Sequence, residues 1–326
     1  MPTITFGTDT FVSQADETVL DTLLRENQPI PYSCKQGICQ SCLMRCMDKT
    51  PPATAQAHLK DTLVQQNYFL SCVCVPQEDM TVALFNAQNH TISASVQHKS
   101  LLAPDIMRLV LRYDLPFDFF AGQFVNLQRA DGLTRSYSIA NTPHIEQRVE
   151  FHIRRLPNGQ FSNWVFDECL VGDTLGLSQA LGSCFYLAGF PEQPLLLIGT
   201  GSGLAPLYGI IQDALAQQHS GPIHLFHGSR HREGLYLIDE LRQLAEQFAN
   251  FSYTACVSGD SEAEDVQRGR VHDIAFNHLK QLKGWRVYLC GHPDMVKDSK
   301  KTAYLKGASL RDIYSDEFVV DSATRR

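Results

Sequence analysis

The sequence of 326 residues contains no apolar run that approaches the roughly 20 residues needed to cross a bilayer. Its first residues, MPTITFGTDTF, lack the positively charged segment and the apolar core of a signal peptide. A basic excess is also missing, because the formal net charge is -7, so nucleic acid is not an expected ligand. These absences predict a cytoplasmic protein that neither inserts into a membrane nor binds nucleic acid.

The composition is that of a globular protein, with 44% hydrophobic and 19% charged residues. The chain is long enough for two or three domains, each with its own core. We find neither an internal repeat nor a low-complexity segment.

The ten cysteines are unevenly distributed, because six of them fall between Cys34 and Cys74. This clustering indicates a metal site, since a disulfide framework is typical of small secreted chains. The remaining four are widely separated, and at the first three we expect small buried side chains. These four are Cys169, Cys184, Cys256 and Cys290.

The pattern of the chain changes twice, which predicts three domains at residues 1–88, 91–190 and 191–326. The first has short alternating strands, a helical spacing of apolar residues at 16–26, and a strand-like MTVALF at 80–85. Residues 86–90 have little apolar content and are interpreted as a linker.

The second segment contains several short alternating strands separated by Gly, Pro and Asp, at 91–97, 106–113, 124–128 and 148–155. This texture predicts an antiparallel barrel or sandwich. Beyond residue 193, continuous apolar strands at 195–198, 223–226 and 286–290 alternate with helical stretches. Strands of that kind predict a buried parallel sheet in an α/β domain.

The cysteine loop has the spacing Cys34-x4-Cys39-x2-Cys42, which is that of plant-type [2Fe-2S] ferredoxins with a distant fourth ligand. Three thiolates from one tight loop wrap two irons, so the loop needs glycine and small residues such as Gly37 and Ser41. We predict Cys72 as the fourth ligand.

Cys74 and Cys46 remain open alternatives as the fourth ligand, because Cys74 is two residues from Cys72 and Cys46 lies just after the loop. Four thiolates can also hold zinc, but zinc sites favour paired Cys-x2-Cys knuckles. Only one such pair of the expected form is present here.

The segment PYSCKQGICQSC at 31–42 closely resembles the cluster loop of plant-type ferredoxin domains. The order of ferredoxin, β domain and α/β domain resembles the reductase components of bacterial oxygenases, such as phenol hydroxylase and benzoate dioxygenase reductases, over nearly the entire chain. The resemblance implies a β-grasp α+β ferredoxin domain, an antiparallel β-barrel FAD domain and a parallel-sheet nucleotide-binding domain.

The segment RSYS, from Arg135 to Ser138, is similar to the Arg-x-Tyr-Ser of the ferredoxin-NADP reductase family. In that family the Arg holds the FAD pyrophosphate, the Tyr packs beside the isoalloxazine, and the Ser approaches flavin N5. A guanidinium, a flat phenol and a hydroxyl suit these three roles. The resemblance therefore implies cofactor contacts for Arg135, Ser136, Tyr137 and Ser138, with Ser138 as a catalytic residue.

Two further segments extend the expected flavin site. HIRR at 152–155 supplies cationic groups on a strand, of which we predict His152 and Arg154 as cofactor-binding, although His152 is equally interpreted as an ordinary strand residue. Gly159 and Ser162 match the family's Gly-x-x-Ser/Thr at a helix start, where free N–H groups favour phosphate. Ser162 as a simple N-cap is the alternative.

The segment LLLIGTGSGLAP places a glycine-rich turn directly after a buried strand and before a helix. A phosphate-bearing ligand can approach such a turn closely because no Cβ intervenes. The spacing departs from the Rossmann fingerprint, which requires Gly where Leu204 stands, but it resembles the Gly-Thr-Gly-x-Gly-x-x-Pro of the reductase family. The predicted contacts are Gly199, Thr200, Gly201, Gly203 and Pro206.

CGHPDM at 290–295 resembles the family's Cys-Gly-x-Pro-x-Met, which implies that Cys290 and Gly291 lie near the nicotinamide and flavin rings, with Cys290 catalytic. DEFV at 316–319 resembles the family's terminal stretch, and there Phe318 is expected to cover the flavin. A buried cysteine at a strand end is the alternative for Cys290.

The sequence gives opposing indications on the choice between NADH and NADPH. Ser229 and Arg230 stand where an acidic residue would bind the ribose of NADH, and an Arg there can accept the 2′-phosphate of NADPH. Oxygenase-type reductases with comparable turns often use NADH, so we favour NADH and keep NADPH open.

The predicted activity follows from the numbers of electrons that the nicotinamide donates and the cluster accepts in one step. Nicotinamide gives two electrons as hydride and the cluster accepts one at a time, so FAD stands between them. We predict an NAD(P)H:acceptor oxidoreductase that passes electrons to a partner oxygenase or other redox protein. The alternatives are a stand-alone reductase of a small molecule or free carrier, and a redox-sensing module, which the complete nicotinamide apparatus disfavours.

Overall fold

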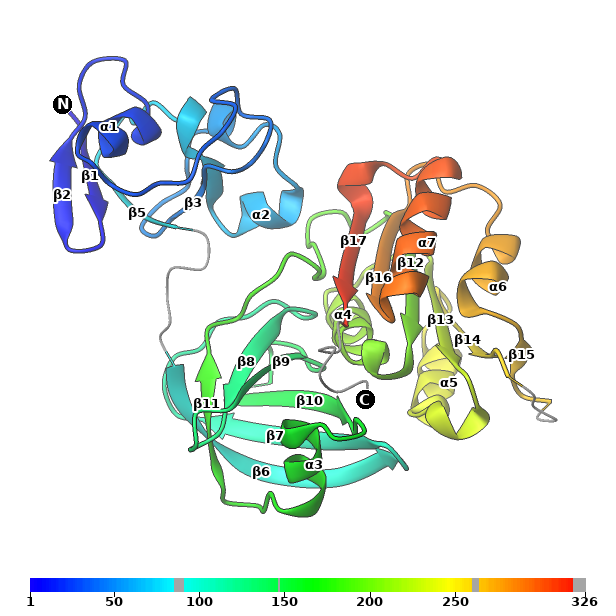
Figure 1. The fold of residues 1–326 in the computed structure, drawn as a ribbon. Helices are drawn as coiled ribbons and strands as arrows, with labels where there is room; N and C mark the ends of the chain where they lie inside the picture. The colour runs from blue at the N-terminus through cyan, green and yellow to red at the C-terminus, as the bar shows by residue number, and fades with distance from the viewer. Residues whose placement is uncertain (85–90, 146, 260–263, 319–326) are drawn as a thin grey trace. The chain divides into compact units, whose positions relative to one another are not determined.

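The computed structural model describes residues 1–84, 91–145, 147–259 and 264–318, and the chain divides into two compact units, Met1–Asn89 and His90–Arg326 (Figure 1). The second unit contains both a barrel and an α/β domain. The multidomain fold class predicted from the sequence is therefore confirmed. The expected linker at 86–90, and Phe85 of the expected strand, lie outside the described residues.

The first unit has one mixed sheet of five strands in the order β2-β1-β5-β3-β4. Among the described strands of this unit, β1 and β5 pair in parallel and the other pairings are antiparallel. Short helices and turns fill the long connections between the strands. Its elements are β1 (Thr3–Phe6), β2 (Asp9–Val12), α1 (Val19–Arg25), β3 (Leu43–Cys46), η1 (Ala53–Ala55), α2 (Asp61–Gln65), β4 (Tyr68–Leu70), η2 (Ser71–Val73) and β5 (Met80–Leu84).

Helix α1 confirms the helical spacing expected at 16–26, and Thr18 begins it as N-cap by accepting the N–H of Asp21. Val19, Leu20 and Leu23 are fully buried in the core of this unit, which also contains Phe69. Burial of that apolar face stabilises a helix too short to persist alone.

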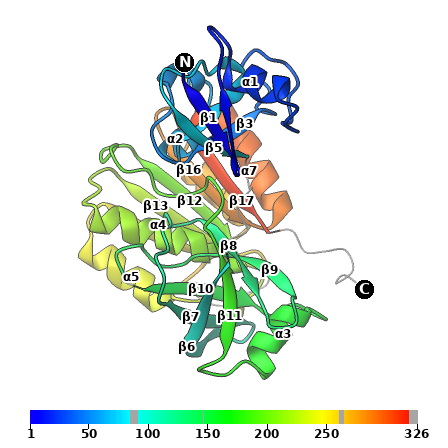
Figure 2. The ribbon, with the colours of Figure 1, turned by 90° about the vertical axis from the view of Figure 1, so that its left-hand side faces the viewer.

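The barrel of the second unit is an antiparallel sheet in the order β10-β7-β6-β11-β8-β9. A bridge between Ile139 and Phe151 joins its two edges, so the sheet closes. Helix α3 lies at one end of the barrel (Figure 2). The elements are β6 (Thr91–Ala103), β7 (Ile106–Tyr113), β8 (Phe124–Gln128), β9 (Thr134–Ser138), β10 (Arg148–Arg154), α3 (Gln160–Asp167) and β11 (Thr174–Ser178).

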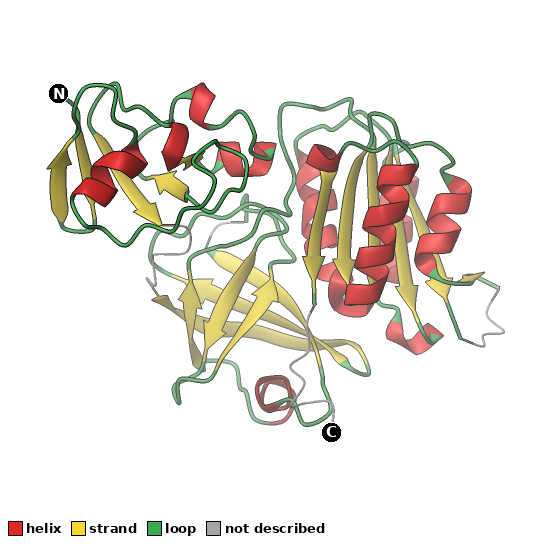
Figure 3. Ribbon diagram, turned by 45° about the horizontal axis from the view of Figure 1, so that its top comes forward, coloured by secondary structure: helices red, strands yellow, loops and turns green. Residues whose placement is uncertain are grey.

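The α/β domain has a parallel sheet in the order β15-β14-β13-β12-β16-β17 with helices on both faces (Figure 3). The three strands expected from continuous apolar runs are β12, β13 and β16. The elements are β12 (Leu195–Thr200), η3 (Gly201–Gly203), α4 (Leu204–Ala216), β13 (Ile223–Ser229), η4 (Arg232–Gly234), α5 (Ile238–Gln247), β14 (Phe251–Val257), β15 (Gln267–Arg268), α6 (Val271–His278), β16 (Arg286–Gly291), α7 (Pro293–Leu305), η5 (Leu310–Asp312) and β17 (Ile313–Glu317).

Barrel and α/β domain meet closely where helix α4 crosses the end of the barrel. A Cβ at Gly209 would lie 3.2 Å from the Ile139 carbonyl oxygen and 3.3 Å from that of Asn141. Glycine therefore allows the helix to approach the barrel backbone.

Within the described residues, none of the helices combines the length and the hydropathy that a membrane span requires.

Candidate functional site

The cysteine loop brings its thiols together in pairs. The N–H of Cys34 lies 3.4 Å from Cys39 Sγ, and the N–H groups of Cys39 and Gln36 lie at the same distance from Cys34 Sγ. The Ser41 hydroxyl, followed by backbone N–H groups, lowers the pKa of the exposed Cys39 to about 6. These donors favour thiolates, which are the form of cysteine that binds iron.

Cys72 faces the loop from the short turn η2. Burial raises the pKa of its thiol to about 11, with the neighbouring Cys42 thiol as a second cause and the Gly37 N–H acting in the opposite direction. Gly37 has φ +73°, and a Cβ there would lie 3.3 Å from Val73. The Ser71 hydroxyl donates to the Cys42 carbonyl at 2.9 Å, which ties the turn to the loop.

The two alternative ligands, Cys46 and Cys74, lie together elsewhere in the core of this unit. Burial raises the pKa of Cys74 to about 12, and Cys46 adds to that effect. The Cys46 thiol is directed to Asp48, 3.3 Å away. This placement favours Cys72 as the fourth ligand, which stays a prediction.

The pairing of thiols fits a two-iron cluster. Among the described residues, no three His, Cys, Asp or Glu side chains are grouped around a position for one metal ion. A [2Fe-2S] cluster needs only two thiolates on each iron. Cys34, Cys39, Cys42 and Cys72 supply four thiols at the expected spacing.

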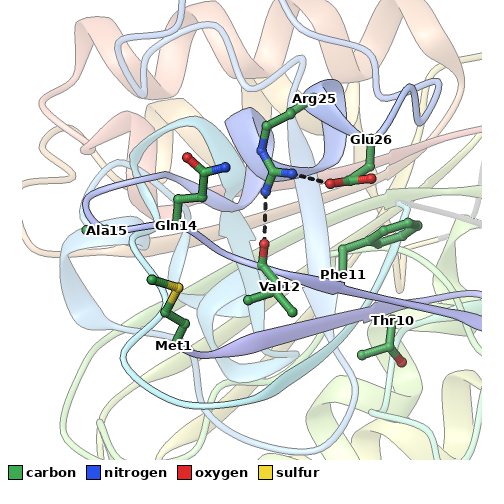
Figure 4. Close-up of a pocket in the computed structure, with 8 residues that line it drawn as sticks. All are labelled: Met1, Thr10, Phe11, Val12, Gln14, Ala15, Arg25 and Glu26. Carbon is green, nitrogen blue, oxygen red and sulfur yellow. Dashed lines mark hydrogen bonds and ion pairs between the residues drawn. The ribbon is translucent and has the colours of Figure 1, made fainter.

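A hollow of about 700 Å³ in the first unit lies between the start of the chain, strand β2 and helix α1 (Figure 4). Arg25 lines this hollow, donates to the Val12 carbonyl at 2.8 Å and pairs with Glu17 at 2.9 Å and with Glu26. The Arg25 guanidinium is therefore already paired with carboxylates of its own unit.

A much larger cleft, of about 1310 Å³, lies in the second unit between the barrel and the α/β domain. It exceeds the roughly 300–1,000 Å³ of a pocket for one drug-sized molecule. It therefore has room for more than one such ligand. The predicted residues that line it are Arg135, Ser136, Tyr137, Ser138, His152, Arg154, Gly159, Ser162, Thr200, Gly201, Ser229, Arg230, Gly291 and Phe318.

The RSYS segment lies in strand β9, and all four of its residues line the cleft. Arg135 is exposed, and its guanidinium donates to the Thr134 carbonyl at 2.8 Å. The Ser138 hydroxyl donates to Asp316 Oδ2 at 2.6 Å. Burial raises the pKa of Asp316, and the Ser138 hydrogen bond opposes that rise. This bond joins the barrel to strand β17 inside the cleft.

Gly159 is the N-cap of helix α3, so the alternative of Ser162 as N-cap is wrong. The Ser162 hydroxyl accepts the Leu156 N–H at 3.1 Å and donates to the Gly159 carbonyl at 3.2 Å. Both of these hydrogen bonds of the Ser162 hydroxyl stabilise the turn that precedes helix α3. The first-turn N–H groups of α3 are then the donors that suit a phosphate.

The glycine-rich turn follows strand β12 as the short 3₁₀ segment η3. Thr200, Gly201 and Ser202 line the cleft, and a Cβ at Gly201 would lie 3.3 Å from the Arg154 guanidinium. Backbone N–H groups and a barrel arginine thus converge, which suits a pyrophosphate.

Four predicted residues support the turn instead of lining the cleft. Gly199 packs on Leu207, and Pro206 is buried in the first turn of α4. A Cβ at Gly203 would collide with the backbone of Cys290, 2.6 Å from its carbonyl carbon. Cys290 lies within strand β16, fully buried, with its sulfur 3.8 Å from that of Cys184. Of the segment at 290–295, the residues that line the cleft are Gly291, His292, Asp294 and Met295.

Sequence reasoning missed several residues of the cleft. Asp316 belongs to the DEFV segment, but its bond to Ser138 joins residues that are 178 positions apart in the chain. Arg270 and His272 come from the start of helix α6, which no motif marked. The buried state expected for Cys169, Cys184 and Cys256 is confirmed.

The residues present fit the cofactors expected from the sequence. The cleft combines cationic side chains, two helix or turn N-termini and the partly buried ring of Tyr137, which are the groups that bind a dinucleotide. Gly201 lines the cleft with φ +54° and carries no Cβ, so a phosphate can approach its backbone closely.

Comparison with protein families divides the chain in the same way. Residues 4–77 match the 2Fe-2S iron-sulfur cluster binding domain, residues 93–186 the oxidoreductase FAD-binding domain, and residues 197–301 the oxidoreductase NAD-binding domain. The expected cofactors, the cluster, FAD and a nicotinamide nucleotide, are thereby confirmed, as is the oxidoreductase class.

Two characterised relatives match almost end to end. One is the ferredoxin–NAD(P)+ reductase component of the naphthalene 1,2-dioxygenase/salicylate 5-hydroxylase systems of Ralstonia, 32% identical over 94% of each chain. The other is the reductase subunit of an aromatic O-demethylase of Amycolatopsis, 32% identical over 93% of this chain and 94% of the other.

Solved structures show the same fold. The Amycolatopsis reductase GcoB has a TM-score of 0.70 and 28% identity, over 99% of this chain and 100% of the other. The ferredoxin reductase in carbazole 1,9a-dioxygenase has a TM-score of 0.65 and 24% identity over 98% of both chains.

Proposed function

The chain belongs to the family of ferredoxin–NAD(P)+ reductase components, and from that premise we propose that it takes electrons from NADH and delivers them to an oxygenase or another redox protein. The observation that carries the proposal is the single cleft in which the RSYS strand and the glycine-rich turn face each other. Bound FAD would accept two electrons from the nicotinamide there and release them singly to the cluster.

On the barrel side, Arg135 offers a guanidinium to the flavin pyrophosphate, and the first turn of α3 behind Gly159 offers N–H groups. Tyr137 provides a flat face for the ring system. Ser138 lines the same cleft, and its hydroxyl donates to Asp316. His152 and Arg154 complete this wall.

On the α/β side, we assign the nucleotide pyrophosphate to the turn Thr200–Gly203 and to Arg154, which reaches over it. Gly291 and Phe318 bound the region where the nicotinamide enters, and Cys290 supports that region from the core. Ser229 and Arg230 lie at the end of β13, where the adenosine ribose is expected.

We further assign the cluster to Cys34, Cys39, Cys42 and Cys72, and the domain boundaries to residues 1–88, 91–190 and 191–326. Localisation in the cytoplasm and a protein partner, as in the relatives whose names include an oxygenase system, belong to the same proposal. No group of this chain has to act as a general acid or base, because electron transfer from nicotinamide needs none.

The test is the visible absorption spectrum of anaerobically purified protein before and after separate additions of NADH and NADPH. We expect flavin and [2Fe-2S] bands that bleach with NADH at lower concentration than with NADPH. A protein that binds FAD and the cluster but bleaches with neither nucleotide would overturn the proposal. Reduction of cytochrome c, compared with reduction of a co-purified oxygenase, separates the stand-alone from the partner-dependent enzyme.

A further inference from the structure

A tyrosine that does not itself line the cleft lies between two buried histidines, one of which does. Tyr236 follows η4, and its ring meets those of His152 and His227 with centroids 5.2 and 5.5 Å apart. Both pairs are edge to face, at 87°. His152 comes from barrel strand β10 and His227 from strand β13 of the α/β domain, so the tyrosine connects the two walls of the cleft.

On the barrel side, the hydrogen bonds determine where the protons lie. His152 Nε2 is 2.9 Å from Glu150 Oε1, and that carboxylate also pairs with Arg108 at 2.9 Å. A paired carboxylate accepts only, so Nε2 carries the hydrogen of the neutral ring and Nδ1 is an acceptor. Burial lowers the pKa of His152, which keeps the ring neutral. The Tyr236 hydroxyl therefore donates to Nδ1, at 3.1 Å.

On the other side, His227 reaches the glycine-rich turn. Its Nε2 lies 3.1 Å from the Gly201 carbonyl oxygen, which also accepts the Leu204 N–H. Burial lowers the pKa of His227 to about 4, so the ring is neutral and carries a single hydrogen. That hydrogen lies on Nε2, because the Gly201 carbonyl oxygen can only accept. Among the described residues Nδ1 has no partner.

Packing alone does not explain a histidine at this position. A fully buried ring with an unsatisfied nitrogen costs free energy that an apolar side chain would not. What the imidazole adds is its bond to Gly201. In a planar trans peptide the carbonyl and the next N–H point in opposite directions. Holding the Gly201 carbonyl toward the core therefore turns the Ser202 N–H away from His227, on a turn that lines the cleft.

We propose that His227 and Tyr236 are positioning residues. His227 orients the glycine-rich turn for the nucleotide, and the Tyr236–His152 bond fixes the position of that turn relative to the flavin-binding barrel. The proposal rests on the proposed function, since it concerns the same nucleotide. It assigns His152 a bridging role in place of a direct cofactor contact.

The chain offers a matched control for the tyrosine. The Tyr186 hydroxyl lies 3.1 Å from His219 Nδ1, also buried and edge to face, but neither residue lines the cleft. Tyr236→Phe and Tyr186→Phe therefore remove the same kind of hydrogen bond with the same ring retained. His227→Phe removes the donor to Gly201, and His227→Gln replaces it with an amide N–H.

The experiment combines three measurements on FAD-loaded protein: thermal melting, calorimetric titration with NAD+, and anaerobic stopped-flow reduction of the flavin by NADH. We expect similar melting losses for both tyrosine variants, but a five- to tenfold slower reduction at saturating NADH for Tyr236→Phe alone. We expect His227→Phe to weaken NAD+ binding at least fivefold and His227→Gln to recover most of it.

Equal reduction rates in the two tyrosine variants, or equal NAD+ affinity in His227→Phe and wild type, would overturn the positioning role. Failure of the proposed function gives a different result, because wild-type protein would then neither bind NAD+ nor be reduced. If wild type uses only NADPH, the same series is run with NADPH and NADP+.

Discussion

Replacing Gly203 with alanine tests whether the contact between η3 and strand β16 shapes the nucleotide site. The added Cβ would lie 2.6 Å from the Cys290 carbonyl carbon and 2.8 Å from Gly291 Cα, and closer still to the Cys290 carbonyl oxygen. All three atoms are backbone, so no side chain can rotate away. Gly203 has φ -61°, which alanine adopts freely, so the effect comes from the collision alone.

The magnitude follows from overpacking, which costs about 1–3 kcal/mol in a well-packed core. In a unit of this size, each kcal/mol lowers the melting temperature by about 2–4 °C, so a loss of roughly 2–12 °C is expected. The structure can relieve the strain by moving the end of β16, which carries Gly291 into the cleft. If nucleotide binding must restore that position at the same cost, affinity falls roughly 5- to 140-fold, at about 1.4 kcal/mol per tenfold.

The assay is calorimetric titration of FAD-loaded Gly203→Ala with NAD+, with thermal melting beside it. Gly284→Ala is the control, because a Cβ there meets nothing within 4 Å and its φ of +82° costs about 1–2 kcal/mol by itself. We expect both variants to melt earlier and only Gly203→Ala to lose nucleotide affinity. Unchanged NAD+ binding in Gly203→Ala would refute the reasoning.

Three further predictions concern other parts of the chain. Cys72→Ser should abolish the [2Fe-2S] absorption of anaerobically prepared protein and Cys74→Ser should retain it; the reverse result would assign the ligand to Cys74. Because burial raises the pKa of Asp316, its contribution to stability is present below pH 3.8 and lost as the pH rises through the folded pKa. Asp316→Asn should therefore melt higher than wild type at pH 7, and a lower melting point would show that the Ser138 bond to the carboxylate dominates. The Arg25 hydrogen bond lowers the pKa of Glu17 to about 2, so its stabilisation is present above pH 4.5 and lost as the pH falls through 2. Glu17→Gln should lose less melting temperature than wild type between pH 4.5 and 3, and parallel curves would contradict this.

Much of the fold was predictable because local pattern and tertiary role coincide. The strands at 106–113 and 124–128 were expected with their observed limits, since alternating apolar residues have one face in the barrel core. The continuous apolar runs at 195–198 and 286–290 likewise became central strands of the parallel sheet, which is covered on both faces. The short strand β15, with two exposed residues, carries no such signal.

The candidate site was less predictable at the residues that pack against each other behind the cleft and do not line it. Gly203 and Cys290 belong to motifs that read as ligand contacts, yet they pack against each other behind the cleft. A motif records that a residue type is required at a position and does not distinguish touching a ligand from shaping the backbone that does. Only the packing of η3 against β16 separates the two.

The amino-acid sequence by itself determined the three-domain order, the cluster spacing and the two dinucleotide motifs, because each depends on residues close together in the chain. The bond from Ser138 to Asp316 and the contacts of Tyr236 with His152 and His227 were decided by the tertiary structure. The bonds of Ser138 with Asp316 and of Tyr236 with His152 join the barrel to the α/β domain. The pairing of side chains so far apart in the chain depends on how these two domains pack, which no local pattern specifies.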